Sequence, residues 1–255
     1  MTPLAAALAA AEEAGRLIRK RYGTALKVRD KGVADIVTEV DAAAERLIRR
    51  RLLAAFPGIP VLGEEGGGGE GADRLWIVDP LDGTVNFAHG YPVFSVSIAL
   101  VDKGRPVAGV VHDPTRQESF RAERSRGAWL GSRRLKVTRR KRLIESLLST
   151  GFSYQRGKAL DRSLAHFGRF HHAARAVRRP GSAAIDLAYV AAGRFDGFWE
   201  TGLKPWDVAA GWLLVEEAGG RVTDYAGRPY RVGTPDILAS NGTLHAPMMR
   251  TLRAP

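Results

Sequence analysis

The spacing of apolar residues changes from a helical to a strand period near residue 75. Before this point, apolar positions three, four or seven residues apart predict two amphipathic helices, at residues 4–22 and 40–52, and Pro57-Gly58 ends the second. Beyond it, short apolar or alternating runs separated by Gly/Pro turns predict successive strands. These strands are expected at residues 75–78, 94–100, 107–111 and 127–131. The pattern favours paired helices followed by an antiparallel sheet.

A different pattern begins after about residue 138, where helices alternate with short strands. Helices are predicted near residues 182–192 and 207–218. Short strands are expected around Leu147, Gly197 and Arg221. The sequence therefore predicts two α/β halves that meet near residue 140. Residues 1–140 would hold the paired helices, the antiparallel sheet and most candidate metal ligands, and residues 141–255 would form a C-terminal α/β half.

The composition excludes several classes of protein. Of the 255 residues, 45% are hydrophobic and 26% are charged, which is typical of a globular protein and not of a disordered or fibrous one. The absence of cysteine excludes a disulfide framework, Cys-ligated zinc and a cysteine nucleophile. The chain has no run of about 18 apolar residues that could span a bilayer, and its Ala-rich start lacks the basic segment of a signal peptide. We therefore expect a cytoplasmic protein.

Positive charge is concentrated in two segments. The formal net charge is +12; residues 121–142 carry +9 and residues 156–179 carry +6, which leaves −3 for the remainder. A solvated arginine-rich surface explains such segments, and so does attraction of a phosphorylated ligand or a polyanionic partner. Binding of RNA or of a transcription complex through these segments therefore stays open as a non-enzymatic function.

A run of glycines at residues 66–71 matches the G-x-G-x-x-G spacing of a dinucleotide-binding loop. In that fold the loop follows a strand and opens a helix, whereas here the apolar run at residues 75–78 comes after the glycines. The dinucleotide interpretation therefore fails, and we expect a flexible loop.

The most informative segment is residues 76–84 (WIVDPLDGT), where an apolar strand ends in two acids. Pro80 fixes φ and forces a turn, so Asp82 can fold back toward Asp79. Two carboxylates within about 4–6 Å of each other repel strongly unless a proton or a cation lies between them. The Gly-Thr pair that follows can present N–H groups to a phosphate. This segment therefore offers cation ligands beside anion donors.

Further acids outside this segment suit the same site. Glu64 or Glu65, just before the glycine run, could reach a cation, although an exposed loop explains them equally well. Asp41 also fits a helix-capping box with Thr38, and Asp207 also fits a helix cap. Carboxylates without cysteine or paired histidines favour Mg²⁺ or Mn²⁺ over zinc.

Five motifs, in order along nearly the whole chain, resemble those of the inositol monophosphatase family. The most specific is DPLDGTVNF at residues 79–87, which is similar to the family signature D-P-[IL]-D-G-[ST]-x-N-[FY]. The others are DIVTEVD at residues 35–41, GEE at 63–65, GSAA at 181–184 and WDVAAG at 206–211. EEAGG at residues 216–220 is also similar to the family's E-A-G-G.

The resemblance implies a layered α-β-α-β-α sandwich of the inositol monophosphatase and fructose-bisphosphatase type, assembled as a homodimer. It also implies two or three Mg²⁺ ions per subunit, with Mn²⁺ as a substitute. The first ion would bind Glu64, Asp79 and the backbone carbonyl of Leu81. The second would bind Asp79, Asp82 and Asp207, and a third, weaker ion would lie near Glu64.

By the same resemblance, Thr84 paired with Asp41 would orient and deprotonate the attacking water, and Glu64 would complete the catalytic set. The N–H groups of Gly83 and Thr84 would hold the phosphate. One metal ion would activate water while the other stabilises the leaving alkoxide, so no side-chain nucleophile is required.

The implied contacts to the rest of the substrate are the Ala183 backbone and the side chains of Glu200, Asp82 and Asp207. Ser153 is a candidate for a further serine of the family, and Arg178 for a substrate or subunit edge, with Arg179 beside it as an alternative. The family also hydrolyses fructose bisphosphate and other esters, so the metal motifs do not choose the substrate. We expect a lithium-sensitive phosphatase acting on inositol 1-phosphate, with a fructose-1,6-bisphosphatase or dual-activity sugar phosphatase as the alternative.

Overall fold

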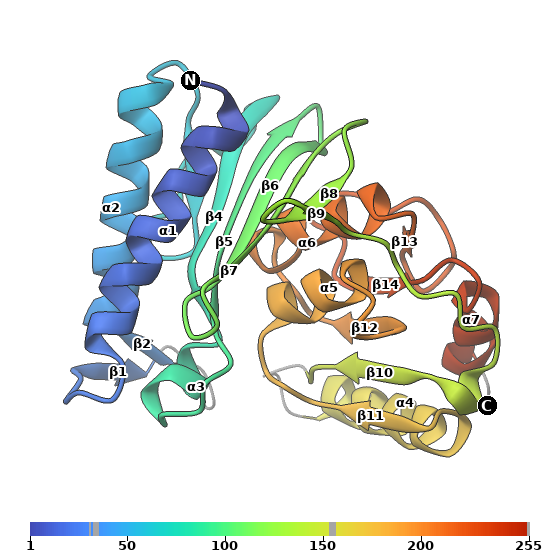
Figure 1. Ribbon diagram of the computed structural model, residues 1–255. Helices are drawn as coiled ribbons and strands as arrows, with labels where there is room; N and C mark the ends of the chain where they lie inside the picture. Colours follow the sequence, from blue (N-terminus) through green and yellow to red (C-terminus); the bar gives the residue numbers. More distant parts are fainter. Residues whose placement is uncertain (31, 33–35, 153–156, 254–255) are drawn as a thin grey trace.

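The computed structural model describes residues 1–30, 32, 36–152 and 157–253. Five layers stack in the order helices, sheet, helices, sheet, helices (Figure 1). One helix pair covers a seven-stranded sheet, a second pair lies between that sheet and a five-stranded one, and a third pair covers the outer face. The predicted sandwich is confirmed. Among the described helices, none is both long and apolar enough to cross a membrane.

The first layer is a helix pair whose starts are fixed by threonine caps. The helices are α1 (Pro3–Arg21) and α2 (Glu39–Ala55), with the short paired strands β1 (Val28–Asp30) and β2 (Ile36–Thr38) between them. Thr2 accepts the N–H of Ala5 at the start of α1, and Thr38 opens α2 in a capping box. The buried face of α1 is mostly alanine, so α1 approaches both α2 and the sheet closely.

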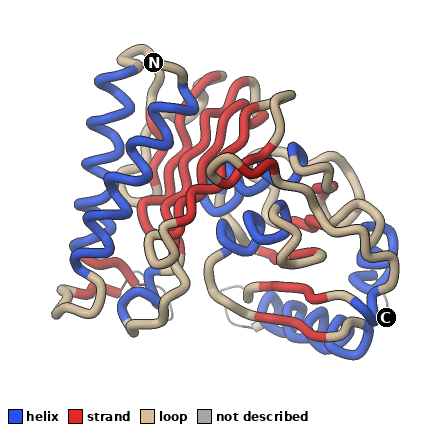
Figure 2. The backbone as a smooth tube through the Cα atoms, viewed as in Figure 1, coloured by secondary structure: helices blue, strands red, loops and turns tan. Residues whose placement is uncertain are grey.

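The seven-stranded sheet is the larger group of red strands in Figure 2. It has the order β3-β4-β5-β6-β7-β8-β9 and is antiparallel except for the parallel pair β3 and β4. Its strands are β3 (Val61–Gly63), β4 (Arg74–Asp82), β5 (Ser95–Asp102), β6 (Arg105–Asp113), β7 (Glu118–Glu123), β8 (Ala128–Leu130) and β9 (Arg133–Arg134). Helices cover both faces at β4, which is why its sequence is an almost continuous apolar run. The short helix α3 (Thr84–Ala88) follows β4.

The five-stranded sheet has the order β11-β10-β12-β14-β13 and mixes parallel with antiparallel pairs. Its strands are β10 (Leu147–Thr150), β11 (Ala176–Arg178), β12 (Gly197–Thr201), β13 (Arg221–Thr223) and β14 (Asp236–Ser240). The helices around it are α4 (Lys158–Ala173), α5 (Ala183–Ala191), α6 (Pro205–Glu217) and α7 (His245–Arg253), and the 3₁₀ turn η1 (Leu143–Glu145) precedes β10.

The middle layer, α5 and α6, is buried almost all round and lies between the sheets. Two glycines permit its close packing. A β-carbon on Gly109 of β6 would lie 3.1 Å from the Cα of Ala210 in α6, and one on Gly211 would lie 2.5 Å from the Cβ of Leu187 in α5. The apolar core therefore joins segments from both parts of the chain. The division of the chain near residue 140 stays a prediction.

Candidate active site

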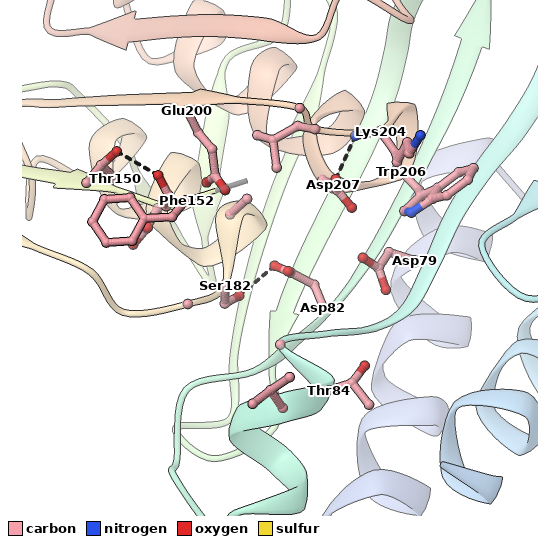
Figure 3. A pocket seen from close by; sticks show the side chains of 18 of the residues that line it. Asp79, Asp82, Thr84, Thr150, Phe152, Ser182, Glu200, Lys204, Trp206 and Asp207 are labelled. Atoms are coloured by element: carbon pink, nitrogen blue, oxygen red, sulfur yellow. Dashed lines mark hydrogen bonds between the residues drawn. The ribbon is translucent and has the colours of Figure 1, made fainter. Parts of the chain in front are cut away.

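The site begins where β4 ends, and a β-bulge sets its geometry. Side chains of a strand alternate between faces, so residues three apart, such as Asp79 and Asp82, ordinarily point to opposite sides. In the pairing with β5, Asp79 lies opposite Ser97. Asp82 lies opposite Ser95, only two residues earlier in β5, so β4 carries one extra residue. The bulge thus returns both carboxylates to one face, where they line the same cavity (Figure 3).

Gly83 follows the bulge in a conformation that only glycine adopts readily. Its φ is 94°, in the left-handed region. A β-carbon there would lie 3.0 Å from the carbonyl oxygen of Val93 and 3.2 Å from that of Gly181. The tight turn starts α3 at once, so Gly83 and Thr84 both line the cavity beside the two aspartates.

Asp41 serves two functions with its two carboxylate oxygens. Its Oδ2 accepts the backbone N–H of Thr38 at 2.9 Å and the Thr38 hydroxyl at 2.5 Å, which caps α2. Its Oδ1 accepts the hydroxyl of Thr84 at 2.8 Å. Burial raises the pKa of Asp41, although the bonds from Thr38 and Thr84 act in the opposite direction. The capping box and the Thr84 pairing therefore coexist, because each uses a different oxygen.

Asp82 connects the end of β4 to the start of α5. Its Oδ2 accepts the hydroxyl of Ser182 at 2.6 Å and the N–H of Ala184 at 2.8 Å. Burial raises the pKa of Asp82 to about 6, and these hydrogen bonds limit the shift because they stabilise the charged form. Ser182 is also the N-cap of α5. The helix start thus holds Asp82 in place.

Asp207 and Asp79 bring further negative charge to the same cavity. Asp207 lies in the first turn of α6, where its Oδ2 accepts the N–H of Lys204 at 2.7 Å. Burial raises the pKa of Asp207 well above its usual range, and Asp82 adds to the shift. Asp79 is buried, and its pKa is likewise raised by burial and then by the neighbouring charges of Glu64, Asp82 and Asp207.

The cavity has a volume of about 350 Å³, and its far end carries different chemistry. There Glu200 of β12 is 9% exposed, and burial raises its pKa to about 8. Its carboxylate packs against backbone, because a β-carbon on Gly151 would lie 2.2 Å from either of its oxygens. Thr150, Phe152 and Arg179 complete this wall. One end of the cavity is thus strongly acidic, and the other combines a carboxyl with a guanidinium and an aromatic ring.

Glu64 reaches the cavity from a hydrogen-bonded turn, and the flexible loop expected at residues 66–71 stays a prediction. Gly63 and Gly67 exchange backbone hydrogen bonds of 3.1 and 3.0 Å around the turn, and the N–H of Glu64 donates to the carbonyl of Val78 in β4. Glu64 lines the cavity, whereas Glu65 is not among the residues of its wall. Of the two glutamates, Glu64 is therefore the one placed to serve the cavity, and its role as a cation ligand stays a prediction. The glycines are needed for positive φ: Gly67, Gly68, Gly69 and Gly71 have φ of 54°, 89°, 74° and 79°.

The donor chemistry fits a hard divalent cation. Glu64, Asp79, Asp82 and Asp207 all present carboxylate oxygens, and Mg²⁺ prefers oxygen ligands. Burial, and then the repulsion among these carboxylates, raises the pKa of Asp79 and Asp207, so a bound cation would offset a repulsion that a proton otherwise offsets. Within the described ranges, however, no three His, Asp or Glu side chains are already gathered as ligands of one ion. The structure brings the acids to one cavity. Asp82 and Asp207, however, each accept a backbone N–H at the start of a helix, from Ala184 and Lys204.

Comparison with known proteins decides the family. The sequence profile of the inositol monophosphatase family matches residues 1–254. This chain belongs to that family. Nus factor SuhB of Pseudomonas aeruginosa is 48% identical over 97% of this chain and 94% of its own, and the inositol-1-monophosphatase of a Synechocystis strain is 46% identical over 94% and 85%. The structure of an IMPase from Thermotoga maritima superposes with a TM-score of 0.92, at 38% identity over 99% of this chain and 97% of that one.

Most residues that the resemblance to the inositol monophosphatase family singles out come together. The residues lining the cavity include Glu64, Asp79, Leu81, Asp82, Gly83, Thr84, Ala183, Glu200 and Asp207. Asp41 lies behind Thr84 and reaches the cavity through it. Arg178 instead lines a second cavity of about 270 Å³, and its neighbour Arg179 lines both. Ser153, Asp35 and Arg156 lie outside the described residues.

Sequence reasoning assigned no role to several residues of this site. Ser182 was visible as the first residue of a predicted helix and in the GSAA motif, yet its bond to Asp82 depends on the meeting of two distant segments. Asp186 is 1% exposed in α5, and burial, then Glu200, raises its pKa well above the usual range. A charged residue in the apolar sequence AAIDLA was the available signal. Lys204 and Trp206 also line the cavity, at the start of α6.

Proposed function

We propose that this member of the inositol monophosphatase family is a Mg²⁺-dependent phosphate monoester hydrolase that releases inositol and phosphate from inositol 1-phosphate. The observation that carries the proposal is a single cavity in which Asp79, Asp82 and Asp207 lie beside the hydrogen-bonded pair of Thr84 and Asp41. Two relatives named inositol-1-monophosphatase, 46% and 42% identical, support the same activity.

The residues that would hold the cations come from three elements. Glu64, Asp79 and the carbonyl of Leu81 would bind the first Mg²⁺. Asp79, Asp82 and Asp207 would bind the second, and the third would lie near Glu64. Bound Mg²⁺ neutralises phosphate charge and lowers the pKa of water. Because every donor is an oxygen, Mn²⁺ is the expected substitute.

The protein groups orient the reactants. Thr84 donates its single hydroxyl hydrogen to Asp41, which leaves lone pairs on the Thr84 oxygen to accept a hydrogen bond from the attacking water. A proton from the water can then pass through the threonine hydroxyl to the buried carboxylate, whose raised pKa favours proton uptake. The N–H groups of Gly83 and Thr84 would bind phosphate oxygens.

At the far end, Glu200 would bind the alcohol part of the substrate together with the Ala183 backbone. With a pKa of about 8, the Glu200 carboxyl keeps its proton at neutral pH, so it can both donate to and accept from a polyol hydroxyl. Asp82 and Asp207 would contact the same sugar from the metal side. These contacts suit a neutral polyol better than a second anion.

Two cationic side chains on the cavity wall favour one alternative substrate class. Arg179 and Lys204 both line the cavity, and the Arg179 guanidinium lies 5.8 Å from the ring of Phe152. A sugar bisphosphate would place its second phosphate near such a cation. Fructose-1,6-bisphosphatase activity, alone or beside inositol phosphatase activity, is therefore the second candidate.

A non-enzymatic function has its own support in the exposed segment 133–142 that leaves the large sheet. All seven of its basic residues are exposed: Arg133, Arg134, Lys136, Arg139, Arg140, Lys141 and Arg142. Arg140 pairs with Asp196 at 3.2 Å and Arg142 with Glu145 at 3.1 Å, so part of this charge is neutralised locally. Relatives at 48% and 44% identity bear the name Nus factor SuhB. Binding of RNA or a transcription complex would give an affinity that falls steeply with salt.

A phosphate-release panel separates these functions. With Mg²⁺, we expect turnover of inositol 1-phosphate, abolition by EDTA, restoration by added Mg²⁺ and inhibition by Li⁺. Faster turnover of fructose 1,6-bisphosphate would select the alternative, and no release from either ester, with tight RNA binding at physiological salt, would refute the phosphatase. Light scattering tests the proposed homodimer against the 27.7 kDa chain mass, and the cytoplasmic location remains an expectation.

A further inference from the structure

Helix α2 carries three charged residues at four-residue intervals: Asp41, Glu45 and Arg49. Residues four apart lie on one face of a helix, so all three can serve the same surface. Asp41 is accounted for by its bond to Thr84. Glu45 and Arg49 have no part in the chemistry above, yet Glu45 is only 3% exposed, and a buried charge requires partners.

The partners of Glu45 are the backbone of the turn that carries Glu64. Its Oε2 accepts the N–H of Glu65 at 2.7 Å, and its Oε1 accepts the N–H of Gly66 at 2.9 Å. The same Oε1 accepts Nε of Arg49 at 2.7 Å, which balances the charge within the helix. Glu45 thus binds the two N–H groups that follow Glu64.

Arg49 holds the turn from both sides. Its Nη1 donates to the carbonyl of Val61 at 2.9 Å, in the strand before Glu64, and its Nη2 donates to the carbonyl of Gly67 after it. The guanidinium side chain is 24% exposed, so these bonds are partly shielded from water. A planar fork with several donors can join two carbonyls in this way, whereas a lysine ammonium lacks that geometry.

Two glycines of the turn lie directly against the carboxylate of Glu45. A β-carbon on Gly63 would lie 2.5 Å from the carboxylate of Glu45, and one on Gly66 would lie 2.7 Å from its Oε1. Both distances are far shorter than van der Waals contact. The carboxylate therefore occupies the space that side chains at these two positions would fill, and the glycine-rich sequence and the buried glutamate form one unit.

We propose that Glu45 and Arg49 are positioning residues of the metal site, which hold the Gly63–Gly67 turn so that Glu64 stays directed into the cavity. A buried ion pair contributes little net stability compared with apolar packing of similar size, so its main effect here is to restrict the turn to one arrangement. The inference rests on the proposed function, in which Glu64 is a ligand of Mg²⁺. Hydrogen-bond partners of metal ligands typically change metal affinity by about 10–100-fold when they are removed.

The test compares Glu45→Gln with a matched variant of the Glu–Arg pair that joins α1 to α2. Glutamine keeps the size of Glu45 but offers one acceptor oxygen in place of two, and its amide group would face N–H donors. Glu13→Gln makes the same change in the pair that joins Glu13 of α1 to Arg51 of α2 by bonds of 2.7 and 2.9 Å, and neither residue bonds to the turn. Arg49→Lys is the second test variant, because it keeps the charge and loses the fork.

Binding of Mn²⁺ is measured directly by electron paramagnetic resonance, and the Mg²⁺ dependence of turnover is measured in parallel. Glu45→Gln and Arg49→Lys are expected to weaken Mn²⁺ binding at least about 10-fold. They should also raise the half-saturating Mg²⁺ concentration, with kcat recovering at high Mg²⁺. Glu13→Gln should bind Mn²⁺ as the wild type does. Because Mg²⁺ binding would also stabilise an unstable variant by mass action, the urea midpoint of each variant is measured in EDTA, and a midpoint equal to that of the wild type separates positioning from stability.

Glu64→Gln serves as the reference for the proposed function. If Glu64→Gln loses Mn²⁺ affinity while folded Glu45→Gln and Arg49→Lys bind as tightly as the wild type, the positioning inference is overturned and the phosphatase stands. If Glu64→Gln binds Mn²⁺ as tightly as the wild type, the metal role of Glu64 fails, and the inference fails with it. If Glu45→Gln does not fold, Arg49→Lys decides by the same criteria.

Discussion

Replacing Glu200 by glutamine should change how the stability of the protein depends on pH. Glu200 is 9% exposed, and burial raises its pKa from 4.5 to about 8, against the opposing charge of Arg179. The folded chain therefore binds this proton more tightly than the unfolded chain does. The resulting stabilisation is fully present below pH 4.5 and is lost as the pH rises through 8.

The size of this effect follows from the two pKa values. Stability changes by about 1.4 kcal/mol per pH unit between them, so the wild type loses about 5 kcal/mol from pH 4.5 to 8 through Glu200 alone, and about 3 kcal/mol of it by pH 7. Glutamine does not titrate, so the stability of Glu200→Gln does not include this pH-dependent loss. The free energy of unfolding of the variant, minus that of the wild type, should therefore increase as the pH rises.

Urea unfolding followed by tryptophan fluorescence, with both proteins in EDTA at matched pH values from 4.5 to 9, measures this difference. Taking the difference cancels every other group that titrates equally in the two proteins. Equal slopes of the urea transitions would show that the unfolded states are comparable. A constant difference across the pH range would show that Glu200 does not retain its proton in the folded protein, and the account of its binding role would be wrong.

Three further variants test the metal end of the cavity. Asp82→Asn should lower kcat by about 100-fold or more without lowering the urea midpoint, because it removes one of several repelling carboxylates; near wild-type turnover would contradict the assignment. Thr84→Val should abolish most activity and Thr84→Ser should retain it, because only the hydroxyl is required. If Thr84→Val and Thr84→Ser had equal steady-state rates, the Thr84 hydroxyl and its bond to Asp41 would have no part in catalysis. Gly83→Ala should destabilise the protein by more than about 1 kcal/mol, because its φ is 94° and a β-carbon would meet the Val93 carbonyl. Gly90→Ala is its control in urea unfolding, since Gly90 also has a positive φ of 71° but no neighbour within 4 Å, and equal losses would refute the steric argument.

The elements predicted from sequence are those with a strong local pattern. The helices expected at residues 4–22 and 40–52 correspond to α1 and α2, and those near 182–192 and 207–218 to α5 and α6. In contrast, α4 was interpreted only as part of a basic segment, because charged residues, three histidines and Gly168 interrupt its apolar pattern. The strand β7 was missed as well. Half of its sequence, ESFRAE, is charged, and only Phe120 and Ala122 of this strand are buried.

The residues of the candidate site likewise fall into those that a local motif identified and those whose position depends on distant segments. The motif DPLDGT identified the acids at the end of β4, because strand, proline, glycine and acid lie next to one another in the chain. The contacts of the glycine run could not be foreseen, because the turn at its start bonds to Glu45 and Arg49 of α2, about 20 residues upstream. The choice between Arg178 and Arg179 likewise required the cavity itself.

By itself, the sequence determined which chemical groups are available: many carboxylates, no thiol, and a proline and glycine that bend the chain beside two aspartates. Local backbone preferences act over a few residues, so such short-range features can be inferred without a fold. Only the tertiary structure decided that Asp207, Ser182 and Glu200 meet Asp79 and Asp82, since their approach depends on the packing of α5 and α6 between two sheets. Burial there raises the pKa values of these carboxyls, a property that no segment possesses alone.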